Sequence, residues 1–289
     1  GEALVLENFE PDISGGYRRI NGYRKYANQV VPLTSSSSES VLMVASFADK
    51  VVAARGEKIF SSSSTELSLG IAAGTSMSGS GIISVLSTSG FSSSGTIQIN
   101  SETFTYTGIS STNFTGVTRA TSSSTAATHS KADVVSENWT ERDTGRTNAA
   151  KYHFERYNFD GNEKIICVDG VNAPVIFNAA MTAADVSESS VAGSTVVAAY
   201  RNHMFYAGKS TSPQEVVFSE PFDEDGFNAG DGAGSIKVDD SVVALKVFRD
   251  SLFIFCENRI FKLTGSSLSD FSVQPVTRNI GCINSFTVQ

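Results

Sequence analysis

The richest set of oxygen ligands in this sequence lies in one acidic loop. Its ligand-bearing side chains are those of Asp223, Glu224, Asp225, Asn228 and Asp231. Oxygen ligands of this kind suit Ca²⁺, but the loop lacks the glycine at the sixth position and the terminal glutamate of a hand-type calcium loop. We therefore expect a solvated connection between strands and predict no metal site.

Other residues that could do chemistry are not arranged to do it. Gly230, Gly232 and Gly234 precede an alternating run, SIKVDDSVVAL, where a phosphate-binding loop would need a helix. Four polar residues recur at the tips of expected hairpins, where such side chains bond their own backbone: Asp49, Asp160, Asn202 and Asp250. The three histidines have no metal-ligand spacing and form no triad with a nucleophile. We expect no enzyme activity, no catalytic residue and no cofactor.

Cysteines and charge exclude further classes of protein. Cys167, Cys256 and Cys282 are odd in number and far apart, so we expect reduced, buried thiols. The net charge of −8 argues against a surface that binds nucleic acid by neutralising phosphates. No apolar run approaches the roughly 20 residues of a membrane span. Gly1 and a short last strand, expected at residues 285–289, indicate a processed, tagged or incomplete chain.

One N-terminal stretch interleaves basic and aromatic residues, a composition that suits base stacking or a protein interface. The candidate interface residues are Tyr17, Arg18, Arg19, Tyr23, Arg24, Lys25 and Tyr26. The alternative is an exposed extension without a partner. Because glycines at 15, 16 and 22 loosen this stretch, an ordered arm must be held by a neighbour. We favour a protein neighbour over DNA.

The elements that position these residues are repeated hairpins. Residues 242–263 match an earlier stretch without a gap, since Phe248 follows Phe47 by 201 positions (248 minus 47) and Phe261 follows Phe60 by the same interval. Weaker copies surround Asp160 and Asn202. The last three copies start at Tyr152, Val196 and Val242, which are 44 (196 minus 152) and 46 (242 minus 196) residues apart. These intervals are close to the length of a four-stranded propeller blade. Phe253 or Phe255 is a core residue of the last copy if its side chain faces the core, and Leu252 and Ile254 are equivalent to these two only if adjoining blades cover both faces.

The interval between the first and second copies is too long for one blade, which predicts an insertion. Its apolar residues alternate in pairs: Ile97 and Ile99, Phe104 and Tyr106, Phe114 and Val117. Glu102, Arg119 and His129 are expected to make structural hydrogen bonds within it. The sequence thus predicts an all-β fold of propeller-like antiparallel blades, complete or incomplete. The predicted division is an N-terminal arm (1–40), a first blade (41–75), an inserted small β-module (76–137) and further blades (138–289).

Two resemblances follow from these segments. LVLENFEPDISGGYRRINGYRKY, the hairpin series and FSEPFDEDGFNAGDGAGSIKVDDSVVALKVFRDSLFIFCENRIFKLTGSSLSDFSVQPVTRNIGC resemble the propeller-bearing tail nozzle or head-to-tail stabilisation (tail hub) proteins of bacteriophages. FSSSGTIQINSETFTYTGISSTNFTGVTRATSSSTAATHS resembles a small β-module inserted in various phage structural proteins. The first resemblance implies a ring of six copies in the virion tail, which contacts adjacent tail or adaptor proteins. Assembly would take place in the host cytoplasm. Phage DNA would pass through its ejection channel without specific binding.

Two other functions remain open on the sequence alone. The chain could be a host-surface or glycan-binding adhesin that uses the inserted module. It could also be a propeller glycosidase, but such an enzyme needs two carboxylates at a defined separation in one pocket, and the acids here fall at turns. The tail subunit accounts best for the arm.

Overall fold

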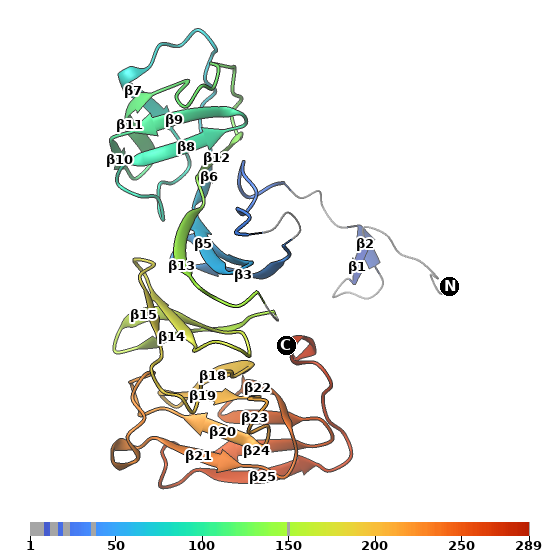
Figure 1. Ribbon diagram of the computed structural model, residues 1–289. Helices are drawn as coiled ribbons and strands as arrows, with labels where there is room; N and C mark the ends of the chain where they lie inside the picture. The colour runs from blue at the N-terminus through green and yellow to red at the C-terminus, as the bar shows by residue number, and fades with distance from the viewer. Residues whose placement is uncertain (1–8, 12–16, 20–23, 36–38, 149–150, 289) are drawn as a thin grey trace.

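The computed structural model describes residues 9–11, 17–19, 24–35, 39–148 and 151–288. Within them the fold is built of antiparallel β-sheets. Four four-stranded sheets follow one another along the molecule, a seven-stranded sheet lies beyond the first of them, and a two-stranded hairpin lies to one side (Figure 1). The all-β prediction is confirmed.

Each four-stranded sheet pairs its strands in chain order, as a meander. The first sheet contains β3 (Val41–Phe47), β4 (Lys50–Arg55), β5 (Lys58–Ser62) and β13 (Thr140–Thr144). The second contains β14 (His153–Phe159), β15 (Asn162–Val168), β16 (Val175–Asn178) and β17 (Ala183–Asp185). The third contains β18 (Val196–Tyr200), β19 (His203–Ala207), β20 (Glu215–Phe218) and β21 (Gly234–Lys237). The fourth contains β22 (Val242–Phe248), β23 (Ser251–Cys256), β24 (Ile260–Thr264) and β25 (Ser272–Thr277).

The seven-stranded sheet, here called the module, interrupts the first meander between β5 and β13. Its strands are β6 (Ser64–Glu66), β7 (Ser78–Ser84), β8 (Gly95–Ile99), β9 (Glu102–Tyr106), β10 (Gly108–Ser110), β11 (Asn113–Thr118) and β12 (Val134–Glu137). Strand β6 lies before the expected start of the insertion at residue 76, yet it pairs with β12. The remaining elements are the hairpin β1 (Phe9–Pro11) and β2 (Tyr17–Arg19) and two 3₁₀ turns, η1 (Ala229–Asp231) and η2 (Ser285–Thr287). The expectation of a short last strand at residues 285–289 is wrong, because η2 occupies most of this range.

The four recurring polar residues sit at hairpin turns, and three of them have left-handed backbone. Asp49 has φ of 58° and Asn202 has φ of 64°, each as the second residue of a two-residue turn, and Asp160 has φ of 57° before Gly161. Asp and Asn tolerate this conformation and suit the turns that match the twist of a hairpin. These residues therefore serve the backbone of the hairpins.

The first and fourth sheets repeat each other down to the irregularities of their ladders. Ala53 pairs with Phe60 in one, and Ile254 pairs with Phe261 in the other. A register shift follows the first residue of β3 and, at the equivalent place, the first residue of β22. The gap-free sequence match thus reflects an equal pairing register.

The main cores lie between neighbouring sheets. One buried cluster joins the first and second sheets, another the second and third, and a third the third and fourth. A fourth cluster fills the module. The first strands β14, β18 and β22 contact one another in turn, and β14 also contacts β3. Sheets that stack face to face along their first strands are blade-like, but a complete propeller is not shown by the described residues.

The side chains of β23 do not all lie in the core. Leu252, Ile254 and Cys256 are fully buried against the third sheet, whereas Phe253 and Phe255 are only half-buried. Successive side chains of a strand point to opposite faces of its sheet. The structure therefore places Leu252 and Ile254 in the core and leaves Phe253 and Phe255 on the other face.

We predict that Ile254→Ala lowers the free energy of unfolding by about 2–5 kcal/mol, the usual cost of a large-to-small change in a packed core. Phe253→Ala should lower it less, because that side chain is half-buried on the opposite face. Urea unfolding followed by circular dichroism measures both values. A larger loss for Phe253→Ala would contradict the assignment of the two faces.

We also predict that the four meanders fold without the module. Val134 of β12 pairs with Glu66 of β6, so residues 67–133 can be replaced by a two-residue Asn-Gly turn between these strands. The excised chain should unfold cooperatively, at lower stability because the module's contacts to the first sheet are lost. Calorimetry measures this. A molten or insoluble product would show that the module belongs to the main core.

Candidate interaction surface

The N-terminal half of the predicted interface lies on a hairpin. Tyr17, Arg18 and Arg19 form β2, which pairs with β1 so that Arg18 lies opposite Glu10. Arg18 is exposed. The side chains of Tyr17 and Arg19, and the whole of Tyr23, lie outside what the structure describes. In Figure 1 this hairpin is separated from the other sheets.

The C-terminal half of the predicted interface is bound to its own chain. Arg24 forms an ion pair with Glu66 of the module and donates a hydrogen bond to the Ala132 carbonyl oxygen at 3.2 Å. The Tyr26 hydroxyl donates to the Ser62 carbonyl oxygen at 3.1 Å, and burial raises the pKa of this phenol. Lys25 is exposed. From residue 24 onward the arm is therefore docked on its own chain.

Docking continues through the next residues, which reach both the module and the first meander. Asn28 donates hydrogen bonds to three groups, Ser136 Oγ (2.9 Å) and the carbonyl oxygens of Gln98 (2.6 Å) and Val134 (2.7 Å). The indole nitrogen of Trp139 donates to the Gln29 carbonyl oxygen at 3.0 Å, and Arg55 donates to that of Val31. We call residues 24–35 the docked segment.

Glu39 closes the end of the docked segment. Its carboxylate accepts hydrogen bonds from the backbone amides of Thr34 (2.7 Å) and Ser35 (2.9 Å) and from both hydroxyls. These bonds favour the ionised form and lower the pKa of Glu39 to about 2. Glu39 thereby binds Thr34 and Ser35 at the end of the docked segment.

A polar latch joins the module to the first meander. Lys50 of β4 donates to Ser63 Oγ at 2.9 Å and lies 3.6 Å from the Glu137 carboxylate. The same carboxylate accepts from the Ser92 amide at 2.7 Å and from the Tyr106 hydroxyl at 3.2 Å. Burial lowers the pKa of Lys50 despite the attraction of Glu137. Since both partners are largely buried, this latch restricts the module's orientation.

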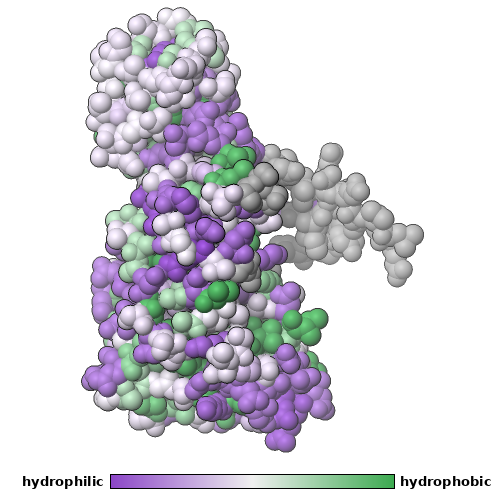
Figure 2. Space-filling view, in the orientation of Figure 1, coloured by the Kyte–Doolittle hydropathy of each residue, from purple (hydrophilic) through white to green (hydrophobic). Residues whose placement is uncertain are grey.

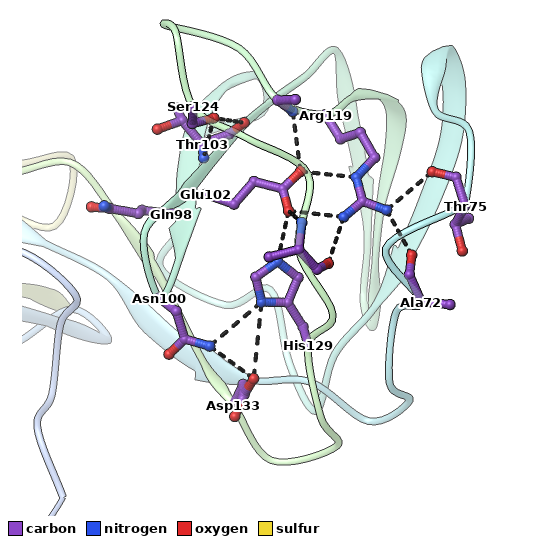
Figure 3. A network of polar contacts seen from close by, with 12 residues as sticks. Ala72, Thr75, Gln98, Asn100, Glu102, Thr103, Arg119, Ser124, His129 and Asp133 are labelled. Carbon is purple, nitrogen blue, oxygen red and sulfur yellow. Dashed lines mark hydrogen bonds and ion pairs between the residues drawn. The ribbon is translucent and has the colours of Figure 1, made fainter.

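Inside the module, three ionisable residues form a closed network (Figure 3). Arg119 donates two hydrogen bonds to the Glu102 carboxylate, both at 2.8 Å, and His129 Nε2 lies 2.8 Å from the same group. Arg119 also reaches the carbonyl oxygens of Ala72 (2.8 Å) and Ala127 (2.8 Å). The expected structural role of these residues is confirmed. With its groups engaged and buried, the network has no side open to a substrate.

The acidic loop is also engaged internally. Glu224 is buried and pairs with Lys164 of β15, while Asp225 accepts from the Ser187 amide at 2.9 Å. Asn228 caps η1 by accepting from the Gly230 amide at 3.0 Å. Over the described residues, no group of three or more His, Cys, Asp or Glu side chains could hold a metal ion.

A hollow of about 450 Å³ lies on the side of the first strands, between β14, β22 and η2. His153 Nε2 lies 2.6 Å from Ser285 Oγ, and its ring stacks on Phe286 at 4.3 Å. Burial raises the pKa of Glu155, against the attraction of Lys246. The C-terminal turn thus returns from the fourth sheet to the second, and the wall between them carries both signs of charge.

Comparisons with known proteins give no family. No protein-family model matches the chain, and no curated protein matches its sequence. Among solved structures, a phage phi92 endosialidase is 15% identical with a TM-score of 0.44, over 86% of this chain and 50% of that one. The Saccharomyces cerevisiae Sqt1 structure is 10% identical with a TM-score of 0.35, over 86% and 76%. BBS1N, from a complex with ARL6DN, is 8% identical with a TM-score of 0.32, over 83% and 68%. This chain spans half the length of the endosialidase chain, and values this low assign neither a family nor an activity.

The structure also bears on the membrane. Among the residues it describes, none of the helical segments has the length and apolarity of a bilayer span.

We predict that the module loses stability in acid through Glu102. Burial opposes ionisation, but hydrogen bonds from Arg119 and the Ala127 amide outweigh it and lower the pKa of Glu102 from 4.5 to about 2. A carboxyl group whose pKa is lower in the folded than in the unfolded protein stabilises the fold at any pH above its unfolded pKa. This stabilisation is lost as the pH falls from about 4.5 towards 2. Glu102→Gln should therefore lower the unfolding midpoint at pH 7 and flatten its dependence on pH in this range.

The control for this prediction is Glu163→Gln, which changes an exposed carboxylate on β15. It should leave both the midpoint at pH 7 and its acid dependence near those of the parent. Calorimetry at several pH values follows all three proteins. An unchanged acid profile in Glu102→Gln would show that other carboxylates control the transition.

Proposed function

We propose that this chain is a structural component of a bacteriophage tail, as a nozzle or head-to-tail stabilisation subunit whose meanders are blades of a β-propeller. The observation that carries the proposal is the docked segment, which holds a hairpin bearing Arg18 and Arg19 apart from a body of stacked meanders (Figure 1). This architecture agrees with the arm, propeller and inserted module that the sequence resemblance implies. In this role the chain is not an enzyme.

The hairpin supplies the contact to a neighbour in this proposal. Arg18 and Lys25 are exposed, whereas Arg24 and Tyr26 fix the base of the arm on its own chain. An arm anchored at one end reaches a partner with less loss of conformational entropy than a free chain. We therefore assign the intersubunit contact to residues before 24, against acidic or apolar surface of an adjacent subunit or adaptor.

A closed ring follows from repeating this contact. One head-to-tail contact between identical subunits closes into a ring when its rotation allows, and six copies agree with the resemblance. The first strands would face the DNA channel, where Glu155, Arg156 and Lys246 mix both signs of charge on β14 and β22. Such a wall, in a chain of net charge −8, favours passage of DNA over binding. The proposed location is the virion tail, after assembly in the host cytoplasm.

Deletion of residues 1–23 tests the proposal. The shortened chain should keep the unfolding midpoint of the parent, because the docked segment is retained, and should fail to enter tails in an assembly assay. Electron microscopy of the parent in particles should show a ring. Deletion of residues 1–35 is the contrasting variant, and it should also lower the unfolding midpoint because Asn28 and its three hydrogen bonds are lost. Particles that assemble normally and retain DNA with the 1–23 deletion would refute the proposed role of the arm.

The alternative is an adhesin that binds a host surface or a glycan. It is favoured by the position of the module at one end of the molecule, with a mostly pale surface of intermediate hydropathy on the visible face (Figure 2). Glycan binding would favour exposed aromatic residues in the module, but Phe104, Tyr106 and Phe114 belong to its core. Binding of host cells by the whole chain, lost on excision of the module, would favour this alternative over a tail ring.

A further inference from the structure

Most of one face of the fourth sheet is left uncovered by the described residues, although Ala244 on it is buried. Cross-strand pairs place Phe253 beside Lys246 on one side and Lys262 on the other, and Phe255 beside Ile260. We call this side the outer face; its residues are Ala244, Lys246, Phe248, Phe253, Phe255, Ile260 and Lys262. Phe253 lies 6.3 Å from Phe248 and 6.4 Å from Phe255, between ring centroids. A row of aromatic rings therefore runs across this face.

The repeat shows what such a face does elsewhere in the molecule. The residues 201 positions earlier are Met43, Ala45, Phe47, Val52, Ala54, Ile59 and Ser61. All but Ser61 belong to the core cluster that the first sheet makes with the second, and Ser61 is buried too. The two sheets have the same ladder, yet Phe47 is 1% exposed and Phe248 is 59% exposed. The difference is that a second sheet covers the first one, while none of the described elements forms a sheet over the outer face.

We infer that the outer face is an interface for a further four-stranded antiparallel sheet, a fifth blade supplied by polypeptide other than residues 1–289. Each of the three interfaces between successive meanders is an apolar contact between two sheets. A further sheet would cover the outer face of the fourth sheet in the same way. The inference deepens the proposed propeller and does not depend on the tail role.

Charge defines the chemistry of this fifth sheet and argues against a second copy of the outer face. Lys262 takes the place of Ser61, so the covering sheet needs a carboxylate opposite it among its apolar side chains, whereas Lys246, in the place of Ala45, already lies across the hollow from Glu155. Two outer faces paired about a two-fold axis would instead bring lysines together. An acidic, apolar sheet face therefore fits better than self-association.

The first measurement uses the 289-residue chain with an anilinonaphthalene sulfonate dye as the probe of exposed apolar surface. The chain should bind the dye, and Phe248→Thr combined with Phe253→Thr should remove most of this binding without changing the oligomeric state. Because these rings are not in the core, the midpoint should stay within about 2 °C of the parent. Phe47→Thr, the equivalent change on the covered sheet, should lower the midpoint by several times that shift.

The second measurement supplies a covering sheet. A copy of the second meander, residues 151–186, is joined to the C-terminus by a flexible linker, with an acidic residue placed opposite Lys262. The extended chain should bind less dye and unfold at higher temperature than the parent, and Phe248→Thr should cancel the gain. The inference is overturned if the extension changes neither property.

Two other outcomes also overturn it. Concentration-dependent dimers of the parent that Phe248→Thr abolishes would mean that a second copy occupies the face. A parent that binds no dye until residues 1–23 are deleted would mean that the chain's own N-terminal segment covers it. None of these readouts uses particles, so a failed tail-assembly assay leaves them unchanged.

Discussion

The structure depends on the burial of sheet faces that are apolar on both sides. In β4 and β23, consecutive residues are apolar, so each sheet must have a neighbour on both faces or leave large side chains in water. The stacked meanders meet this requirement at three interfaces. The docked segment contacts the first meander at the Ser62 carbonyl oxygen and at Arg55. The outer face of the fourth sheet is the place where the requirement is left unmet by the described residues.

Much of the fold could be predicted from the sequence, because two copies of a repeat that match without a gap must pair their strands in the same register. Turn residues at Asp49, Asp160 and Asn202 fix the hairpins locally, and the match between β3–β5 and β22–β24 has no gap. The half-burial of Phe253 could not be predicted, because an apolar residue in a doubly apolar strand looks the same whether or not a neighbour covers it. Strand β6 was missed for another reason. It is short and polar, and its pairing with β12 depends on residues about 70 positions away.

The interaction surface was predicted less well than the fold. Composition identified a basic, aromatic arm, but Arg24 and Tyr26 bind groups of their own chain that are remote in sequence, such as Ala132. Nothing in the local pattern signals these partners. Asn28 and Trp139 were not singled out, although an isolated tryptophan near a strand end is a residue that usually needs a partner for its N–H. The network of Glu102, Arg119 and His129 was predictable, because few ionisable residues lie among so many apolar and hydroxyl side chains.

The docked segment also couples parts of the molecule that would otherwise move separately. The module is connected to the first meander by two short chain crossings, between β5 and β6 and between β12 and β13, a connection that allows bending. Asn28 bonds the module at three points and Arg55 holds Val31 on the meander, so the arm bridges both bodies next to the latch of Lys50 and Glu137. The docked segment and the latch therefore hold the module against the first meander at several separate points, which the two chain crossings alone would not provide.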